Sequence, residues 1–337
     1  MTPFHPFLEK AASGSPLSGE EMRAAMALLL DGAVSEIETA GFLMALRARG
    51  ETVTEIAAAA EAMRTKALRV DAPDSVVDTC GTGGDGAGTF NISTAAALVA
   101  AGAGARVAKH GNKAASSLSG SAEVLEALGV KIDIAPELIS RAIREAHVGF
   151  MFAALHHRAV ANVATVRKSL GVRTLFNLLG PLANPAGARR QLMGVFSDAL
   201  VEPLAHALLQ LGAVRAWVVH GEDGLDELTT TGKSFVAEVI DGSVRSFTVR
   251  PADAGLPEAP PAALKGGDPR ENAAALKRLL AGERSAYRDI VVFNAAAALI
   301  VADRAHNLKE GAEMAAASID EGRAKQALEK LVAISNE

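Results

Sequence analysis

The sequence predicts an α/β protein in which a small all-helical N-terminal domain is joined to a larger domain with a mainly parallel central sheet. Residues 1–72 carry amphipathic helical patterns and no strand signal. From Ser75 onward, short β-branched runs alternate with alanine- and leucine-rich helical segments, which is typical of a parallel sheet covered on both faces. We therefore expect a helical domain over 1–72, joined by helices around 160–185, and an α/β domain over 75–337.

The boundaries of the N-terminal helices follow from their capping residues. Ser18 precedes two glutamates and is a typical N-cap. Gly50 follows an apolar stripe and is expected to close the next helix. A further helix is expected to begin at Thr52 or Thr54, and Pro73 ends the helical block.

Strands and helices then alternate along the rest of the chain. The segment 163–185 breaks this rhythm, because it carries a helical pattern without a strand, and we expect it to pack with the N-terminal helices. Residues 232–266 begin as an antiparallel hairpin with an Asp-Gly turn. Strands are expected at 75–80, 105–110, 148–153, 215–220 and 289–296, and helices at 92–103, 121–129, 136–146 and 198–212.

Composition narrows the class of protein. The chain of 337 residues is 49% hydrophobic and 22% charged, which is ordinary for a globular protein. A net charge of -5 and an aromatic content of 4% give no reason to expect a nucleic acid or an anionic membrane as partner. No signal peptide or bilayer-spanning run is apparent, and the single Cys80 excludes an internal disulfide. We expect a soluble, cytoplasmic protein.

A glycine-rich loop follows the first expected strand. Gly81, Gly83 and Gly86 have the G-x-G-x-x-G spacing of dinucleotide-binding loops, and a helix begins near Asn91. Glycines let a ligand approach the backbone amides, and the helix N-terminus adds unpaired N–H groups, so an anion is the expected ligand. The alternative is a plain glycine turn in which Asn91 or Ser93 caps the helix.

The surroundings of this loop disfavour NAD. A dinucleotide-binding unit needs an acidic residue at the end of its second strand to bind the ribose, but here that strand ends in Lys109 and His110. Asp85, inside the loop, would repel a bare pyrophosphate. No G-K-[ST] triplet follows, which excludes a P-loop. Another phosphate-bearing ligand is therefore favoured over a dinucleotide.

Two more polar loops follow strands of the same sheet. The loop 222–227 holds four carboxylates, and such oxygen ligands suit Mg²⁺ when water and substrate phosphates complete its shell. The carboxyl ends of parallel strands share one edge of a sheet, so these loops are expected to meet the glycine loop there. Each loop taken alone also fits an ordinary solvated surface loop. After the second strand, the side chains expected to bind phosphate oxygens are Lys109, Asn112, Lys113, Ser116 and Ser117.

Three side chains on other segments are candidates for an acceptor pocket. His156 and His157 follow the third expected strand, where they either line such a pocket or stabilise a loop. Arg167 lies on the helical segment, where its guanidinium either binds a carboxylate or is an exposed helix arginine.

Together these motifs resemble those of the anthranilate phosphoribosyltransferases. The resemblance rests on "DTCGTGGDGAGTFNIST" from Asp78, "KHGNKAASSLSGSAEVLEALG" from Lys109, "VRKSLGVRTLFNLLGPLANP" from Val166 and "HGEDGLDELT" from His220. It implies transfer of the phosphoribosyl group of phosphoribosyl pyrophosphate (PRPP) to the amine of anthranilate, a step of tryptophan biosynthesis. It also implies Mg²⁺ as cofactor and a homodimer formed through the helical domain.

The resemblance also implies roles for individual residues. Lys109 and Arg167 are expected at the reacting groups, and His156 is expected to accept the departing proton. Ser93, Asp226 and Glu227 are expected to hold Mg²⁺, and Gly81, Asn112 and Arg167 to contact anthranilate. PRPP is expected to contact Gly81, Gly84, Asp85, Thr89, Asn91, Ile92, Ser93, Thr94, Lys109, His110, Gly111, Asn112, Lys113, Ala114, Ala115, Ser116, Ser117 and Ser121.

Some residues depart from the family pattern. Lys113 stands where an arginine is expected, which keeps the charge but loses the planar fork, and Leu118 stands where a lysine is common. Two related activities remain as alternatives. One is a pyrimidine nucleoside phosphorylase, whose signature segments are absent. The other is a nucleic-acid-binding relative without enzyme activity, which should be basic.

Overall fold

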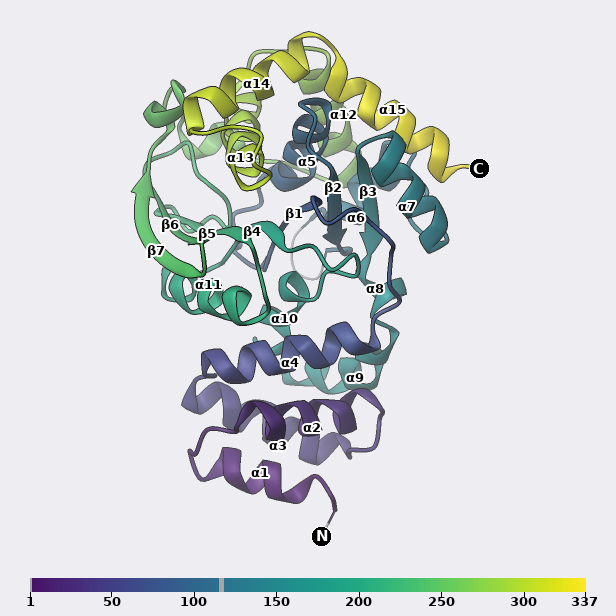
Figure 1. Ribbon diagram of the computed structural model, residues 1–337, viewed down its shortest axis with the longest axis vertical. Coiled ribbons are helices and arrows are strands. Elements are labelled where there is room, and N and C mark those ends of the chain that lie inside the picture. Colours follow the sequence, from purple (N-terminus) through teal and green to yellow (C-terminus); the bar gives the residue numbers. More distant parts are fainter. Residues whose placement is uncertain (1, 115–117) are drawn as a thin grey trace.

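The N-terminal helices begin at the side-chain caps that the sequence predicts. In the computed structural model, which describes residues 2–114 and 118–337, Ser18 and Thr52 each form a capping box with the glutamate three residues later. Gly50 ends a helix with a φ of 88°, which residues with a side chain rarely adopt. These helices form the lower part of the molecule in Figure 1: α1 (His5–Ala12), α2 (Gly19–Leu30), α3 (Glu36–Arg49) and α4 (Val53–Lys66).

A seven-stranded sheet forms the centre of the upper part. Its order is β3-β2-β1-β4-β5-β6-β7, in which the first five strands are parallel and the last two are antiparallel. The last hairpin turns at Asp241 and Gly242, whose φ values of 49° and 73° fit the expected Asp-Gly turn. The strands are β1 (Val77–Gly81), β2 (Val107–Gly111), β3 (Val148–Phe152), β4 (Arg190–Gly194), β5 (Arg215–Gly221), β6 (Ser234–Ile240) and β7 (Ser243–Val249).

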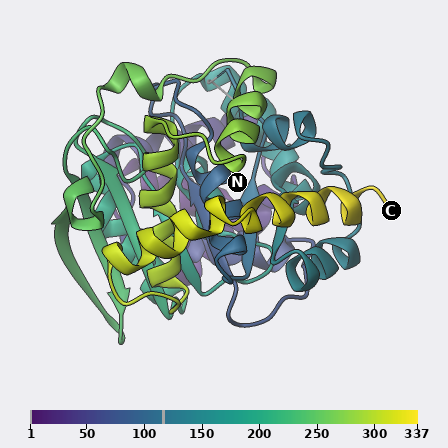
Figure 2. The ribbon, with the colours of Figure 1, turned by 90° about the horizontal axis from the view of Figure 1, so that it is seen from above.

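Helices cover both faces of the sheet, as the alternation of strands and helices predicts. Neighbouring strand residues point to opposite faces, so that Leu192 and Trp217 belong to one apolar cluster and Met193 and Val218 to another. The C-terminal helices lie across the face of the sheet that carries Leu192 and Trp217 (Figure 2). Helices of the first cluster include α5 (Ile92–Gly102), α6 (Ser121–Ala127), α7 (Pro136–Glu145), α12 (Pro269–Leu280), α13 (Ala286–Val301), α14 (Leu308–Asp320) and α15 (Arg323–Ser335).

The second apolar cluster extends from the sheet into the N-terminal helices. It includes α10 (Phe176–Leu182) and α11 (Val201–Gln210), both of which pack against α4. The short α8 (Ala153–His156) leads from β3 toward α9 (Ala161–Leu170), which packs against α2 and α3. The helical segment around 160–185 therefore joins the N-terminal helices, as expected. No helix in the described ranges is both long and apolar enough to cross a membrane.

Two element predictions are wrong. The strand expected at 289–296 lies inside helix α13, which is buried along nearly its whole length, so its apolar run shows no helical periodicity to distinguish it from a strand. Strand β4 was not predicted, because Arg190, Gln191 and Met193 do not form a β-branched run. β4 nevertheless occupies a central place in the sheet.

The junction of β1 and β4 fixes where a ligand can bind. Chain connections leave toward opposite sides of the sheet between these two strands, and α/β proteins commonly bind ligands at such a point. Gly81 and Gly194 lie in register there. A Cβ atom at either glycine would overlap Asp226, so glycine is required for the acidic loop to approach the strand ends.

Candidate active site

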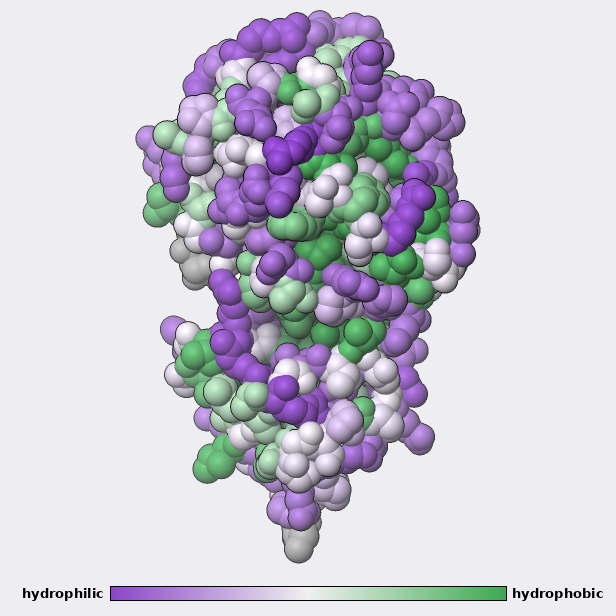
Figure 3. All heavy atoms as spheres, turned by 90° about the vertical axis from the view of Figure 1, so that its left-hand side faces the viewer, coloured by the Kyte–Doolittle hydropathy of each residue, from purple (hydrophilic) through white to green (hydrophobic). Residues whose placement is uncertain are grey.

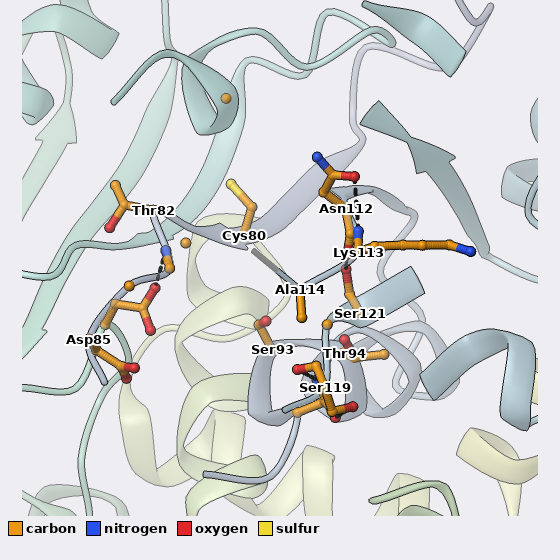
Figure 4. Close-up of a pocket in the computed structure, with 18 of the residues that line it drawn as sticks. Cys80, Thr82, Asp85, Ser93, Thr94, Asn112, Lys113, Ala114, Ser119 and Ser121 are labelled. Atoms are coloured by element: carbon orange, nitrogen blue, oxygen red, sulfur yellow. Dashed lines mark hydrogen bonds between the residues drawn. The ribbon is translucent and has the colours of Figure 1, made fainter. Parts of the chain in front are cut away.

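A cavity of about 400 Å³ opens at the carboxyl ends of β1 and β2 (Figure 4). Arg167 and Phe176, from the segment that packs with the N-terminal helices, complete its lining. On the face shown in Figure 3, the molecular surface narrows between the upper and lower parts of the molecule, and hydrophobic side chains gather there. Most of the residues expected from the sequence line this cavity. They are Gly81, Gly84, Asp85, Thr89, Asn91, Ile92, Ser93, Thr94, Lys109, His110, Gly111, Asn112, Lys113, Ala114, Ser121, Arg167, Asp226 and Glu227. Ala115, Ser116 and Ser117 lie outside the described residues.

The glycine loop presents unpaired backbone amides. Gly83, Gly84 and Gly86 have φ values of 64°, 77° and 72°, in the left-handed region that favours glycine. The N–H of Gly83 donates to Asp226 Oδ2 at 2.7 Å. Over residues 2–114 and 118–337, no protein acceptor binds the N–H groups of Gly84, Asp85 or Gly86. Successive free amides of this kind form a concave anion-binding nest.

Contacts from distant segments hold this loop in place. Arg173, between α9 and α10, donates to the carbonyl of Gly84 and places its guanidinium carbon 3.9 Å from the centre of the Phe196 ring. Lys265 donates to the carbonyl of Ala87. The loop is therefore fixed from its outer side, and its free amides remain available to a ligand.

Lys109 is the cation at the floor of the cavity. Its side chain is buried, and its ammonium donates to the carbonyl of Thr79 and to Ser93 Oγ, the latter at 3.3 Å. Burial lowers the pKa of Lys109, and the negative charge of Asp78 acts in the opposite direction. An anionic ligand would favour the charged form of this lysine.

The loop after β2 places its lysine differently from what the sequence predicts. Lys113 points away from Ser93 and Thr94 and forms an ion pair with Glu126 at 3.2 Å (Figure 4). Its backbone N–H donates to Asn112 Oδ1 at 2.9 Å. The ammonium of Lys113 therefore has a protein partner outside the expected phosphate site, although the residue lines the cavity.

The four carboxylates of the acidic loop fall into two pairs. Glu222 accepts from the N–H of Lys233 at 2.9 Å, and Asp223 accepts from hydroxyls within its own loop. Asp226 and Glu227 turn toward the cavity instead, where Glu227 Oε1 accepts from the N–H of Ser93 at 3.0 Å. The first pair shapes the loop and the second pair reaches the site.

The carboxylates at the cavity are not balanced by cations. Burial raises the pKa of Asp226, and the charge of Asp85 raises it further. Burial likewise raises the pKa of Glu227, with a further contribution from the charge of Asp226. The charge of Lys109 acts in the opposite direction on Glu227 but does not reverse the rise of its pKa. A divalent cation would relieve the repulsion.

The oxygen atoms at the cavity suit Mg²⁺ better than a metal ion that is coordinated by protein side chains alone. Oxygen atoms of Asp226, Glu227 and Ser93 border the cavity. Among the described residues, no three side chains of histidine, cysteine, aspartate or glutamate converge on one point. Mg²⁺ commonly takes one or two carboxylates and completes its shell with water and substrate phosphates.

Arg167 faces the cavity from the helical side. It lies on α9, with its guanidinium carbon 5.3 Å from the centre of the Phe176 ring, and burial lowers its pKa. Within the described part of the chain it has no ion-pair partner. Its guanidinium is therefore free to bind an incoming carboxylate, and it is not simply an exposed helix arginine.

The histidines near the cavity are neutral and have different positions. His110 lines the cavity and packs edge-on against His157 with ring centres 5.1 Å apart. Burial, together with the positive charge that His157 would carry, lowers the pKa of His110 to about 3, and burial lowers that of His157 to about 4.

The expected role of His156 does not fit its position. The side chain is buried outside the cavity, and its Nδ1 lies 2.6 Å from the carbonyl oxygen of Leu68, in the link that follows α4. Burial lowers its pKa, which makes it a weaker proton acceptor. His156 therefore stabilises the link between the helices and β3, and we withdraw it as a proton acceptor.

Several residues that support the site were missed from the sequence. Asn184 donates to Asp78 Oδ2 at 2.7 Å, and the other oxygen of Asp78 accepts from the N–H of His110 at 3.1 Å. Gly194 makes room for the acidic loop, and Asn272 bonds Asn91 at 2.9 Å. Asn184 could have been found, because it is the polar residue of the otherwise apolar motif "GPLANP". No local pattern marks Asn272.

Comparisons with known proteins cover almost the whole chain. The a/b domain of a glycosyl transferase family matches residues 73–325, and its helical bundle domain matches residues 5–67. The anthranilate phosphoribosyltransferase of Parvibaculum lavamentivorans is 57% identical over 100% of this chain and 98% of its own length.

Solved structures agree with the sequence matches. Anthranilate phosphoribosyltransferase from Thermus thermophilus superposes with a TM-score of 0.94 at 48% identity, covering 98% of this chain and 99% of its own. The Saccharomyces cerevisiae enzyme in complex with PRPP and Mg superposes with a TM-score of 0.91 at 30% identity, covering 99% and 98%. From these matches and the cavity that its motifs line, the chain belongs to the anthranilate phosphoribosyltransferase family.

Proposed function

We propose that this chain transfers the 5-phosphoribosyl group of PRPP to the amine of anthranilate, with release of pyrophosphate, and that the cavity is its active site. The observation that carries the proposal is the pairing of two kinds of group in one cavity. Free loop amides, Lys109 and buried carboxylates lie on one wall, and Arg167, which has no ion-pair partner among the described residues, lies on the other. The first set suits a sugar pyrophosphate and the second suits the carboxylate of an aromatic acid.

The glycine loop and Lys109 bind the donor. As charge accumulates on the departing pyrophosphate, the free N–H groups of Gly84, Asp85 and Gly86 and the buried ammonium of Lys109 stabilise it. These groups are already oriented before PRPP binds, because Asp226 and Arg173 hold the loop. Little reorganisation is then needed during the reaction.

Ser93, Asp226 and Glu227 are the residues that we propose to hold Mg²⁺. When bound there, Mg²⁺ neutralises part of the charge on the pyrophosphate. The charges of Asp78, Glu227 and Asp226 favour the protonated form of Lys109 and oppose the effect of its burial.

Arg167, with Asn112 and Gly81, positions the acceptor. The guanidinium of Arg167 binds the anthranilate carboxylate and thereby directs the amine toward the anomeric carbon, which is a contribution of proximity. The aromatic amine is already unprotonated at neutral pH, so the site needs no strong general base. The neutral His110 fits such a site.

We also propose that the chain divides near residue 70 into a helical domain and an α/β domain, and that it forms a homodimer through the helical domain. On α3, Ile37 is 86% exposed and Met44 is 37% exposed, and their spacing of seven residues places both on one face of the helix. An I37E variant should shift the mass measured by light scattering from a dimer to a monomer.

The reaction proposed here takes place in the cytoplasm. The buried, unpaired Cys80 fits a reducing compartment.

A fluorescence assay tests the proposed activity. Incubation of the chain with PRPP, Mg²⁺ and anthranilate should abolish anthranilate fluorescence, and omission of any one component should prevent the change. Thymidine with inorganic phosphate is the matched control for a pyrimidine nucleoside phosphorylase. Phosphorolysis of thymidine without loss of anthranilate would overturn the proposal.

A further inference from the structure

A buried asparagine outside the three loops contacts one of the residues at the cavity. Asn272 lies in the first turn of α12 and is 1% exposed. Its Nδ2 donates to Asn91 Oδ1 at 2.9 Å, and its Oδ1 accepts from the N–H of Gly267 at 2.8 Å. Both ends of the side-chain amide are therefore occupied, and one of them holds Asn91.

Asn91 uses its own amide to join two loops. It is the N-cap of α5, yet its side chain makes no capping hydrogen bond to that helix. Its Nδ2 donates to the carbonyl of Ser119 at 3.2 Å, and its Oδ1 accepts from Ser119 Oγ at 3.2 Å. The side chain thus links the helix after the glycine loop to the loop after β2 and does not cap α5.

The segment before Asn272 lies along the glycine loop. The N–H of Gly266 donates to the carbonyl of Gly88 at 3.0 Å, and the N–H of Phe90 donates to the carbonyl of Leu264 at 3.2 Å. A Cβ atom at Gly266 would lie 2.8 Å from the nitrogen of Phe90, closer than such atoms normally approach. Asn272 therefore anchors a segment that already follows the rear of the loop.

We propose that Asn272 is a positioning residue for the phosphoribosyl donor and that it acts through Asn91. The Nδ2 group of Asn272 can donate to Asn91 only when Asn91 Oδ1 faces α12. In that orientation, Asn91 Nδ2 faces the carbonyl of Ser119. Without this donor, the Asn91 amide is held only by its two hydrogen bonds to Ser119, each 3.2 Å long, and both loops lose their connection to α12. Because both loops line the cavity on the side assigned to PRPP, the inference rests on the proposed function.

The isosteric variant N272D isolates this hydrogen bond. The aspartate keeps an acceptor for the N–H of Gly267 but turns an oxygen toward Asn91 Oδ1. We expect the KM for PRPP to rise about five- to thirty-fold and the KM for anthranilate to stay within about two-fold. If N272D does not fold, N272S, which removes the amide donor but introduces no charge, is measured in its place.

A double-mutant cycle tests whether the effect passes through Asn91. The N91A/N272A variant should have the same KM for PRPP as N91A alone, since nothing remains for Asn272 to orient. N307A is the matched control, because it removes an asparagine cap from α14 at a site outside the cavity lining. It should lower the melting temperature without changing either KM.

Three results would overturn the inference. They are an unchanged KM for PRPP in the N272 variant that folds, an equal rise of both KM values, and full additivity of N91A with N272A. Each requires a wild-type chain that turns over PRPP and anthranilate. A wild-type chain without that turnover would refute the proposed function, and with it this inference.

Discussion

The two walls of the cavity are built in different ways. The donor wall consists of the glycine loop, Lys109 and the carboxylates Asp226 and Glu227, and its charges are buried. The acceptor wall consists of Arg167 on α9, Phe176 and His110, behind which His157 packs. Among the described residues, Arg167 has no ion-pair partner. The donor wall must stabilise a large developing charge, whereas the acceptor wall has only to hold a carboxylate in place.

The supports of the two walls differ as well. The donor wall is held by hydrogen bonds from the α9–α10 link, the acidic loop and α12, which are far apart in sequence. The acceptor wall is carried by helices that pack with the N-terminal helices. A substitution in one wall should therefore change the KM of one substrate, either PRPP or anthranilate, and leave the KM of the other unchanged.

The largest effect should follow from removing the carboxylates of the donor wall. D226N/E227Q is expected to lower kcat/KM by about 1000-fold or more, because the residues proposed to hold Mg²⁺ are lost. The melting temperature should hold or rise, since two buried, mutually repelling charges disappear. The control is E222Q/D223N, which changes the other two carboxylates of the same loop and should retain activity within a few-fold. Wild-type turnover in D226N/E227Q would remove the metal assignment.

The next effect is a change in the free energy of unfolding in acid, and it arises from two neutral histidines at the acceptor wall. The folded-state pKa values of His110, about 3, and His157, about 4, lie below the unfolded value of about 6.5. The folded state then binds fewer protons between these values, so stability is complete above about pH 6.5 and is lost as the pH falls. Between pH 7 and 5 the two histidines together should lower the free energy of unfolding by about 2–4 kcal/mol. Asp226 and Glu227, whose pKa values are raised, act in the opposite direction, so the contribution of a histidine is measured as the difference between the wild type and a histidine variant.

Chemical denaturation at several pH values measures this loss. As the pH is lowered from 7 to 5, the free energy of unfolding of H157Q should rise relative to that of the wild type, whereas H206Q, at an exposed histidine, should follow the wild type. An identical slope in wild type and H157Q would show that His157 is not a neutral buried group.

Removal of the acceptor cation should have a smaller effect, confined to one substrate. R167A is expected to raise the KM for anthranilate about 10- to 100-fold, because a charge-assisted hydrogen bond to its carboxylate is lost. The KM for PRPP should change less than about three-fold, and R167K should recover part of the loss. Equal effects of R167A on both substrates would contradict the carboxylate role.

The smallest effect should come from loosening the donor wall at its outer side. R173Q is expected to raise the KM for PRPP about three- to ten-fold, because the Gly84 carbonyl loses a charged donor. R189Q removes a similar bond, between an exposed arginine and the carbonyl of Gly212, away from the cavity, and should leave both KM values unchanged. Equal KM values in R173Q and R189Q would show that the hydrogen bond from Arg173 to Gly84 does not contribute to PRPP binding.

Local signals in the sequence predicted much of this molecule. The spacing of glycines and the polar loops after strands placed the cavity at one sheet edge, because chain direction in a parallel sheet leaves few alternatives. The capping residues placed the N-terminal helices. Each of these features depends on residues close together in the chain.

The rest depended on contacts between distant segments. Nothing in the acidic loop distinguishes Asp223 from Asp226, and their roles separate only through Thr231 and Gly83. His156 looked like a site residue because it follows a strand, but Leu68 draws it into the helical junction. Asn272 lies 181 residues from its partner Asn91, beyond the range of any local pattern.

We infer that the donor wall and the acceptor wall each bind one substrate and work separately within one reaction. Both Michaelis constants, measured side by side in the wild type, N272D and R167A, test it most directly. The claim predicts a crossed result, in which N272D weakens PRPP alone and R167A weakens anthranilate alone. Parallel rises of both constants in either variant would contradict it.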